Sequence, residues 1–279
     1  MTDENNNIGI IAGGGQFPII VADAAKKQGL FVTAVAFEGE AAPELSGKVD
    51  EIEWIKLGQL GRLIKVFKDK NVSKALMAGT INKSRMFGKI HPDLKGFAFL
   101  SKFALFHDDN ILRALSNELY NEGIEIVSST IYLPDLLAPD GCLTKRKPDK
   151  EEKKDIEIGW KVAKELGRLD IGQCVVIRNK TILALEAIDG TNSTILRGGK
   201  IAGEKAVVVK VSKPNQDLRF DVPSVGLETI MSMVEVKAGL LAIEAGKTLI
   251  FDKEKMIALA DENKISIISC EYQDTPLTK

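Results

Sequence analysis

The chain has 279 residues, of which 44% are hydrophobic and 28% are charged, so it can bury a core and is not expected to be disordered. Lys and Arg number 38 against 39 for Asp and Glu, which gives a net charge of −1. Because binding along a phosphate backbone needs a basic surface, this balance argues against nucleic acid as the main partner. The polar start lacks a signal-peptide core and no apolar run is as long as a membrane span, so we expect a cytoplasmic protein.

The first half of the chain alternates between expected strands and helices. An apolar strand at 8–12 ends in Gly13-Gly14-Gly15, a helix runs from Pro18 to Gly29, and a second strand follows at 30–37. Helical periodicity then covers 58–70 and 109–121, and apolar runs at 75–78 and 124–128 predict strands. This alternation predicts an α/β fold whose N-terminal domain is a Rossmann-like parallel sheet covered by helices.

A strongly charged run occupies residues 144–155 and cannot be a core element. It is either a linker or the solvated start of a helix that ends near Gly167. We place the domain boundary here, which gives a first domain at 1–143, a linker at 144–155 and a second domain at 156–279.

The second half of the chain has a different pattern of expected strands and helices. Strands are expected at 174–178 and 181–187, joined by a hairpin turn at Asn179-Lys180, and a β-rich run covers 206–212. A helix is expected at 226–236, and strands at 249–251 and 265–270 flank another helix. The pattern predicts a C-terminal mixed α/β domain that does not repeat the first.

The glycine turn is the first candidate site, and with the helix start it comprises Gly13, Gly14, Gly15, Gln16, Phe17 and Pro18. Glycines let a backbone approach a phosphate, and a helix N-terminus supplies N–H groups and a positive dipole end. Pro18 replaces the third glycine of the dinucleotide fingerprint, which favours another nucleotide over a nicotinamide cofactor. Gly79 and Thr80, at the end of a later strand, join the predicted nucleotide set. The alternative is a tight connection that binds no ligand.

A second candidate is the stretch from Asp217 to Val222, in which polar and apolar residues alternate. An extended strand would place Asp217, Arg219 and Asp221 on one face. Two carboxylates around an arginine can hold a divalent metal and a phosphate together, and Asp217 and Asp221 are the candidate metal ligands. The alternative is a half-buried strand with a solvated charged face.

Two further segments have open interpretations. After an expected strand come residues that suit either a ligand site or a turn with a helix cap, namely Glu186, Asp189, Gly190, Thr191 and Asn192. A phenylalanine-rich stretch between Phe97 and Phe106 suits core or dimer packing, and equally an acyl-chain wall or a membrane-contacting patch.

Several segments together resemble one family: 11–18, 172–176, 186–192, 213–223 and 244–248. Their order and the chain length are similar to those of the UDP-2,3-diacylglucosamine pyrophosphatases of lipid A biosynthesis, the type unrelated to the calcineurin-like enzyme for the same step. The resemblance covers nearly the whole chain, although no single segment is decisive.

The resemblance implies hydrolysis of UDP-2,3-diacylglucosamine to UMP and 2,3-diacylglucosamine 1-phosphate, with water attacking the α-phosphorus. It implies a divalent cation, Mg²⁺ or another such as Mn²⁺, and a homodimer. It places the catalytic aspartate at Asp221, UDP on the N-terminal domain and the acylated sugar phosphate on the C-terminal one. A lipid substrate further implies transient contact with the membrane surface, peripheral at the inner membrane. The residues expected at the sugar and its phosphate are Glu186, Asp189, Gly190, Thr191, Asn192, Lys213, Gln216 and Arg219.

Two other functions stay open at this point. A nicotinamide-dependent oxidoreductase could start with the same strand, turn and helix, but the third glycine and a clear catalytic Tyr-Lys or His-Asp pair are missing. A non-catalytic UDP-sugar-binding protein would leave the Asp217–Asp221 cluster unexplained. Scattered cysteines and histidines give little support for a zinc or serine hydrolase.

Overall fold

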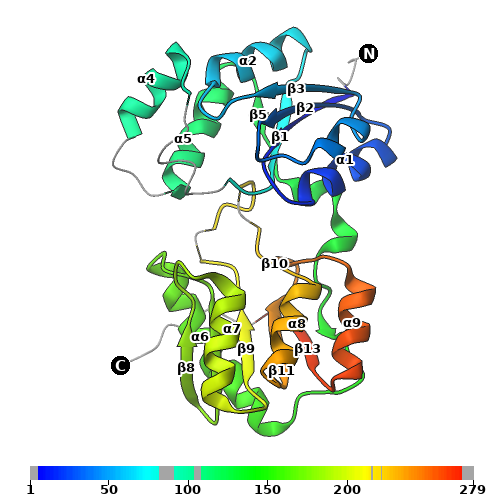
Figure 1. Ribbon diagram of the computed structural model, residues 1–279, viewed down its shortest axis with the longest axis vertical. Coiled ribbons are helices and arrows are strands. Elements are labelled where there is room, and N and C mark those ends of the chain that lie inside the picture. The colour runs from blue at the N-terminus through cyan, green and yellow to red at the C-terminus, as the bar shows by residue number, and fades with distance from the viewer. Residues whose placement is uncertain (1–5, 82–90, 104–107, 215, 221, 272–279) are drawn as a thin grey trace. The chain divides into compact units, whose positions relative to one another are not determined.

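The computed structural model describes residues 6–81, 91–103, 108–214, 216–220 and 222–271. The chain divides into two units, the first made of Met1–Pro134 with Asp217–Phe220 and the second of Asp135–Gln216 with Asp221–Lys279 (Figure 1). The division after Pro134 differs from the expected boundary at 143/144. The chain also returns briefly to the first unit at 217–220, which the sequence did not suggest.

The first unit is built on a five-stranded parallel sheet of order β3-β2-β1-β4-β5. This is one half of a doubly wound fold, with its strand order reversing at β1. Its described elements are β1 (Asn7–Ala12), α1 (Phe17–Lys27), β2 (Phe31–Phe37), β3 (Glu51–Ile55), α2 (Leu60–Asp69), β4 (Lys74–Ala78), α4 (Leu94–Phe103), α5 (Asp108–Asn121) and β5 (Glu125–Ile126), with short 3₁₀ turns at Pro43–Gly47 and Ser129–Tyr132.

The core of the first unit forms where α2 and α5 pack on the sheet. Leu63 and Phe67 of α2, Leu119 of α5 and the strand residues Ile11 and Val35 belong to one buried cluster. Helix α1 is outside this cluster and packs its own buried face against β1, β2 and β4. Helices therefore cover both faces of the sheet and leave the strand ends for the connecting loops.

The second unit contains a six-stranded mixed sheet of order β6-β13-β11-β9-β7-β8. Strands β9, β11 and β13 are parallel, β6 is antiparallel to β13, and β7 is antiparallel to β8 and β9. Its described elements are β6 (Gly141–Cys142), α6 (Lys150–Arg168), β7 (Cys174–Arg178), β8 (Thr181–Leu185), α7 (Gly190–Ala202), β9 (Val207–Lys210), β10 (Ser224–Val225), α8 (Leu227–Glu235), β11 (Leu240–Glu244), β12 (Leu249–Ile250), α9 (Lys253–Glu262) and β13 (Ser266–Cys270).

Two buried clusters fill the second unit, one on each face of its sheet. Helix α6 packs Ile156 and Trp160 against Val175 and Val209. Helices α7, α8 and α9 cover the other face, where Ile195, Ile230 and Met256 meet the sheet. The expected fold class is confirmed: a parallel-sheet α/β unit followed by a mixed α/β unit.

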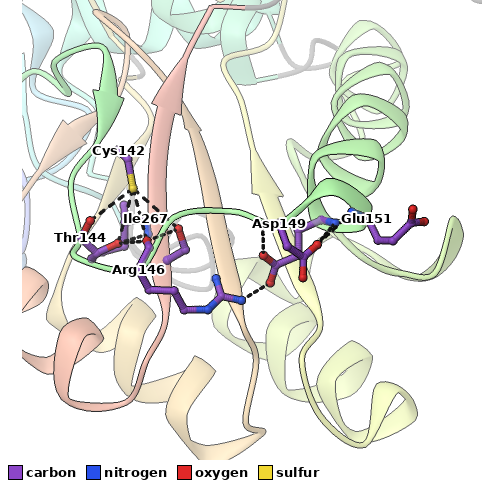
Figure 2. A network of polar contacts seen from close by, with 8 residues as sticks. Cys142, Thr144, Arg146, Asp149, Glu151 and Ile267 are labelled. Carbon is purple, nitrogen blue, oxygen red and sulfur yellow. Dashed lines mark hydrogen bonds and ion pairs between the residues drawn. The ribbon is translucent and has the colours of Figure 1, made fainter.

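The charged run at 144–155 lies inside the second unit. Asp149 caps α6, accepting hydrogen bonds from the Glu151 and Glu152 amides at 2.9 and 2.8 Å, while Glu152 accepts from the Asp149 amide at 2.9 Å. Figure 2 shows this capping box beside a second set of contacts, in which the Thr144 hydroxyl accepts from the Ile267 amide at 2.9 Å. Arg146 pairs with Glu152 in the same network. Residues 150–155 therefore form the start of a helix, which was one of the two expected interpretations of this run. Thr144, at the other end of the run, is buried.

The expected strand at 217–222 is wrong in its first part. The Phe220 amide donates to the Asp217 carbonyl at 3.0 Å, so residues 217–220 form a turn. A sequence in which polar and apolar residues alternate can also form a turn. In this turn the Arg219 side chain folds back onto Asp217. Asp221 lies outside the described residues.

Within the described ranges, none of the helices combines the length and the apolar character that crossing a membrane requires.

Candidate functional site

The glycine loop lies at the carboxyl end of β1, where the strand order of the first sheet reverses. The Gly13 amide donates to the Ala78 carbonyl at 2.8 Å. Gly14 and Thr80 exchange two backbone bonds, at 2.7 Å from the Gly14 amide and 3.1 Å from the Thr80 amide. The loops after β1 and β4 are thus joined at the position where open α/β sheets bind ligands. Of the predicted nucleotide residues, the structure brings Gly13, Gly14, Gly79 and Thr80 together.

Three glycines in these loops are required for different reasons. A Cβ atom at Gly13 would lie 2.6 Å from the Thr80 carbonyl oxygen, and one at Gly79 would lie 2.5 Å from that of Gly14. These two residues allow the loops to approach each other. Gly15 has φ +86° with nothing within 4 Å of a built Cβ, so its backbone conformation favours glycine while the space beside it is open. Gly15 is therefore the loop glycine whose surroundings leave room for a ligand.

The start of α1 follows this loop and suits an anion. Gln16 is the N-cap residue and its side chain makes no capping bond, and the first turn contains no acidic residue. Pro18 occupies a first-turn position, where its missing N–H costs no helix bond. The positive end of the helix dipole is thus not neutralised by a carboxylate of its own first turn.

The turn at 217–220 is anchored within the first unit. Arg219 donates from Nε to Asp217 Oδ1 at 2.9 Å and from Nη2 to Oδ2 at 2.7 Å, and from Nη1 to the Ser116 hydroxyl of α5 at 3.3 Å. The Ser128 hydroxyl donates to the Leu218 carbonyl at 2.9 Å, and Phe220 packs against the hydrophobic core of this unit. Because Ser128 follows β5, the turn lies at the same strand edge as the glycine loop.

Arg219 controls the charge of Asp217. Its hydrogen bonds lower the pKa of the Asp217 carboxyl below the ordinary value, against the opposing effect of burial. Asp217 therefore stays ionised and both of its oxygens are engaged by Arg219, while the Arg219 side chain remains 41% exposed.

Arg219→Gln is expected to destabilise the protein by about 0.5 kcal/mol at neutral pH, since one partner is substantially exposed. A lowered folded-state pKa contributes stability that is present above the unfolded pKa of about 3.9 and is lost as pH falls through the folded value. The difference in unfolding free energy between wild type and variant should therefore shrink below about pH 4. Urea unfolding at a series of pH values measures it. A difference that is constant down to pH 2 would show that the charge pair is not its source.

The segment at 186–192 lies at one edge of the second sheet. Glu186 is buried at the end of β8, where its Oε2 accepts from the Gln173 amide at 2.9 Å and its Oε1 accepts from the Thr191 hydroxyl at 2.7 Å. Asp189 is the N-cap residue of α7, accepts from the Ala187 amide at 3.1 Å and pairs with Arg197 at 3.0 Å. The expected turn before α7 is thus present, but Asp189 and not Thr191 or Asn192 is the N-cap residue, and its side chain makes no capping hydrogen bond to the helix. A ligand role for Gly190, Thr191 and Asn192 stays a prediction.

The ends of β9 and β11 bring further polar groups to this edge. Lys213 pairs with Asp170 at 2.5 Å, and its amide donates to Gln216 Oε1 at 2.8 Å. These predicted residues belong to the second unit, whereas Arg219, predicted with them, belongs to the first. Next to them lies a buried group that the sequence did not assign to the site, Lys164, Ser212 and Glu244. Two signals pointed to Glu244: it is an acid that ends an apolar run, and it opens the segment 244–248 of the family resemblance.

A divalent-metal site does not emerge from the described residues. Among them, no three His, Cys, Asp or Glu side chains form a group that could hold a metal ion. Asp217 is committed to Arg219, and Asp221, its predicted partner, lies outside the described residues. The described residues by themselves therefore do not fit a protein-held metal centre.

The sequence matches the family model described as the LpxI N-terminal domain over residues 7–136 and that described as the LpxI C-terminal domain over residues 139–268. It is also 30% identical over 282 residues to the "UDP-2,3-diacylglucosamine pyrophosphatase LpxI" of Caulobacter vibrioides (strain ATCC 19089 / CIP 103742 / CB 15), covering 96% of this chain and 99% of that protein. The chain belongs to the LpxI family. The family resemblance expected from the segment order is thereby confirmed, and the LpxI domains coincide closely with the two units.

Similarity to solved structures is distant. The biotin carboxylase subunit of pyruvate carboxylase gives a TM-score of 0.27 at 14% identity. The match covers 61% of this chain and 34% of the biotin carboxylase chain. An L-amino acid ligase from Bacillus licheniformis gives a TM-score of 0.27 at 13% identity, covering 67% of this chain and 41% of the ligase. Similarities this low carry no argument about the function of the LpxI family.

Proposed function

We propose that the chain hydrolyses the diphosphate of UDP-2,3-diacylglucosamine, releasing UMP and 2,3-diacylglucosamine 1-phosphate. The observation that carries this is the LpxI relationship over nearly the whole chain, through both domain families and a 30% identical relative that is named as a UDP-2,3-diacylglucosamine pyrophosphatase. The joined glycine loops at the switch point of the first sheet support the proposal, because open α/β sheets bind ligands at this position.

The uridine end is assigned to the first unit. Backbone N–H groups around Gly15 and the start of α1 would bind the phosphate next to uridine, because the loop is open there and the helix dipole is unopposed. Arg219, at the same strand edge, adds a cation that is held in place by Asp217. A fixed, pre-oriented guanidinium stabilises the charge that develops on phosphate oxygens.

The acylated sugar phosphate is assigned to the second unit. Lys213 and Gln216 follow β9, and Thr191 begins α7 at the end of β8, so all three lie at one sheet edge. Asp221, which matches the catalytic position of the family, would accept the proton of the attacking water. Phosphoanhydride hydrolysis needs charge neutralisation and an oriented water, and no covalent nucleophile is invoked.

Incubating the protein with UDP-2,3-diacylglucosamine in H₂¹⁸O tests both the reaction and the point of attack. Attack on the α-phosphorus places the label in UMP, and attack on the β-phosphorus places it in the sugar 1-phosphate. The proposal expects labelled UMP. Absence of UMP refutes the activity, and label in the lipid product refutes only the point of attack.

The need for Mg²⁺ or Mn²⁺ stays a prediction. Diphosphates carry their own oxygen ligands, so a cation can bind mainly through substrate, with one or two protein carboxylates. UMP release should stop in excess EDTA and return on addition of Mg²⁺. Full activity after exhaustive chelation would remove the cation from the proposal.

The family resemblance also supports a homodimer, a cytoplasmic location and brief contact with the membrane that holds the lipid. On α4, Leu94 and Phe97 are 93% and 66% exposed, a face suited to lipid contact, whereas Phe99 packs into the core of the first unit. Phe103 lies at the end of α4, and Phe106 lies outside the described residues. Sedimentation of a Phe97→Ser variant with liposomes tests the membrane contact, and equilibrium centrifugation of the wild type tests the homodimer.

A further inference from the structure

A buried ion pair lies beneath the carboxyl edge of the second sheet. Lys164, on the last turns of α6, is 7% exposed, and Glu244, the last residue of β11, is 4% exposed. The Lys164 ammonium donates to both oxygens of Glu244, at 3.1 and 2.9 Å. Burying a charged pair to this depth costs desolvation energy, so a contribution to stability does not by itself explain why the pair is present.

The pair holds the backbone of one residue from both sides. Glu244 Oε2 accepts from the Ser212 amide at 2.8 Å and from the Ser212 hydroxyl at 2.6 Å. Lys164 donates to the Ser212 carbonyl at 3.1 Å. The amide, hydroxyl and carbonyl of Ser212 are thus all tied to the same ion pair.

Glu244 is held in the charged form that these contacts need. Burial opposes its ionisation, but hydrogen bonds from Lys247, Ser212 and Lys164 outweigh this and lower the pKa of the carboxyl. Lys247 reaches Glu244 Oε1 at 2.8 Å from the more exposed side.

Ser212 occupies the point where the chain leaves β9 for the proposed substrate residues. Lys213 follows it directly, and the Gln216 amide donates back to the Lys213 carbonyl at 3.0 Å. We propose that Lys164 and Glu244 act as a positioning pair, clamping Ser212 so that Lys213 and Gln216 are presented to the sugar phosphate in a fixed geometry. This rests on the proposed function for the identity of the ligand, but not for the clamp itself.

Removing the clamp should lower kcat, because Lys213 and Gln216 would no longer be held in a fixed position. Glu244→Met, which removes both acceptor oxygens, is expected to lower kcat about 10- to 100-fold, the scale of a small misplacement at a reacting centre. Glu244→Gln keeps one acceptor oxygen and should recover part of that loss. In Lys164→Met, Glu244 keeps its hydrogen bonds with Ser212 and Lys247. This variant serves as a second test if Glu244→Met does not fold. UMP affinity, assigned to the first unit, should not change in any of them.

Asp155 offers a matched control. It is also a buried carboxylate of the second unit, 5% exposed, and it also accepts two backbone amides, from Asn179 at 2.9 Å and Lys180 at 2.6 Å. It clamps the β7–β8 turn, at the opposite edge of the sheet. Asp155→Asn should therefore lower the melting temperature as Glu244→Gln does, while kcat stays at the wild-type value.

Site-resolved hydrogen exchange separates the clamp from the activity. Exchange at the Lys213 and Gln216 amides should accelerate in Glu244→Met and Lys164→Met, and not in Asp155→Asn. Unchanged exchange at these two amides overturns the clamp, and accelerated exchange with normal kcat overturns its role in the reaction. If the wild type releases no UMP, the proposed function fails by itself and the exchange measurement still decides the clamp.

Discussion

An Asp221→Ala variant is expected to release UMP about two to four orders of magnitude more slowly than the wild type, the range for losing a general base. The diphosphate is negative, so water can attack phosphorus only when charge is neutralised and a proton acceptor is at hand. Asp221 matches the catalytic position that the LpxI resemblance implies. Substrate binding should survive and become tighter, because one negative charge near the diphosphate is removed.

Single-turnover kinetics on the folded variant, with substrate binding measured by calorimetry, checks this result. Asp69→Ala, which removes an exposed acid at the end of α2, is the control and should keep wild-type rates. Near-normal UMP release by Asp221→Ala would remove this residue from the mechanism. A loss of melting temperature with little loss of rate would make it a structural residue.

Gly15→Val is expected to weaken UMP binding about 10-fold or more. A side chain at φ +86° costs about 1–2 kcal/mol of backbone strain, and the new atoms would occupy the open space in which a phosphate is proposed to lie. Gly13→Val is the less informative variant, because its Cβ would collide with the Thr80 backbone and displace the loop whether or not a ligand binds there.

Gly123→Val controls for the strain. Gly123 has φ +84° and, like Gly15, nothing within 4 Å of a built Cβ, but it lies in the turn before β5, at the opposite edge of the sheet. Both variants should lose similar stability in urea, while only Gly15→Val should lose UMP affinity by calorimetry. Equal UMP affinities in the two variants would place the uridine site elsewhere.

Local signals predicted the elements whose shape depends on a few neighbouring residues. The strand, glycine loop and helix at the start were predicted because Gly15, Pro18 and Gly29 have local backbone roles. The Asn179-Lys180 turn was likewise readable, and both residues have positive φ, 50° and 64°. The start of α6 could have been found from its capping box, Asp149 with Glu152.

Features that depend on distant partners could not be predicted. Strand β3 contains charged residues and β11 is a short apolar run, and only their neighbours in the sheet show that they are strands. The burial of Thr144 depends on Ile267, far along the chain. The Lys164–Glu244 pair joins a helix to a strand end 80 residues later, and periodicity shows Lys164 only as one more helical lysine.

The return of the chain at 217–220 affects how the protein can be made. Ribosomal synthesis runs from the N-terminus, and N-terminal domains generally fold first. Here the sheet of the first unit is complete by β5, but Phe220 and the Arg219 contact to Ser116 are supplied by residues translated much later. Until residues 217–220 are translated, the nascent first unit therefore lacks these contacts and part of its core stays uncovered. A gene fragment that stops at the end of the first domain would encode a unit that lacks the same contacts.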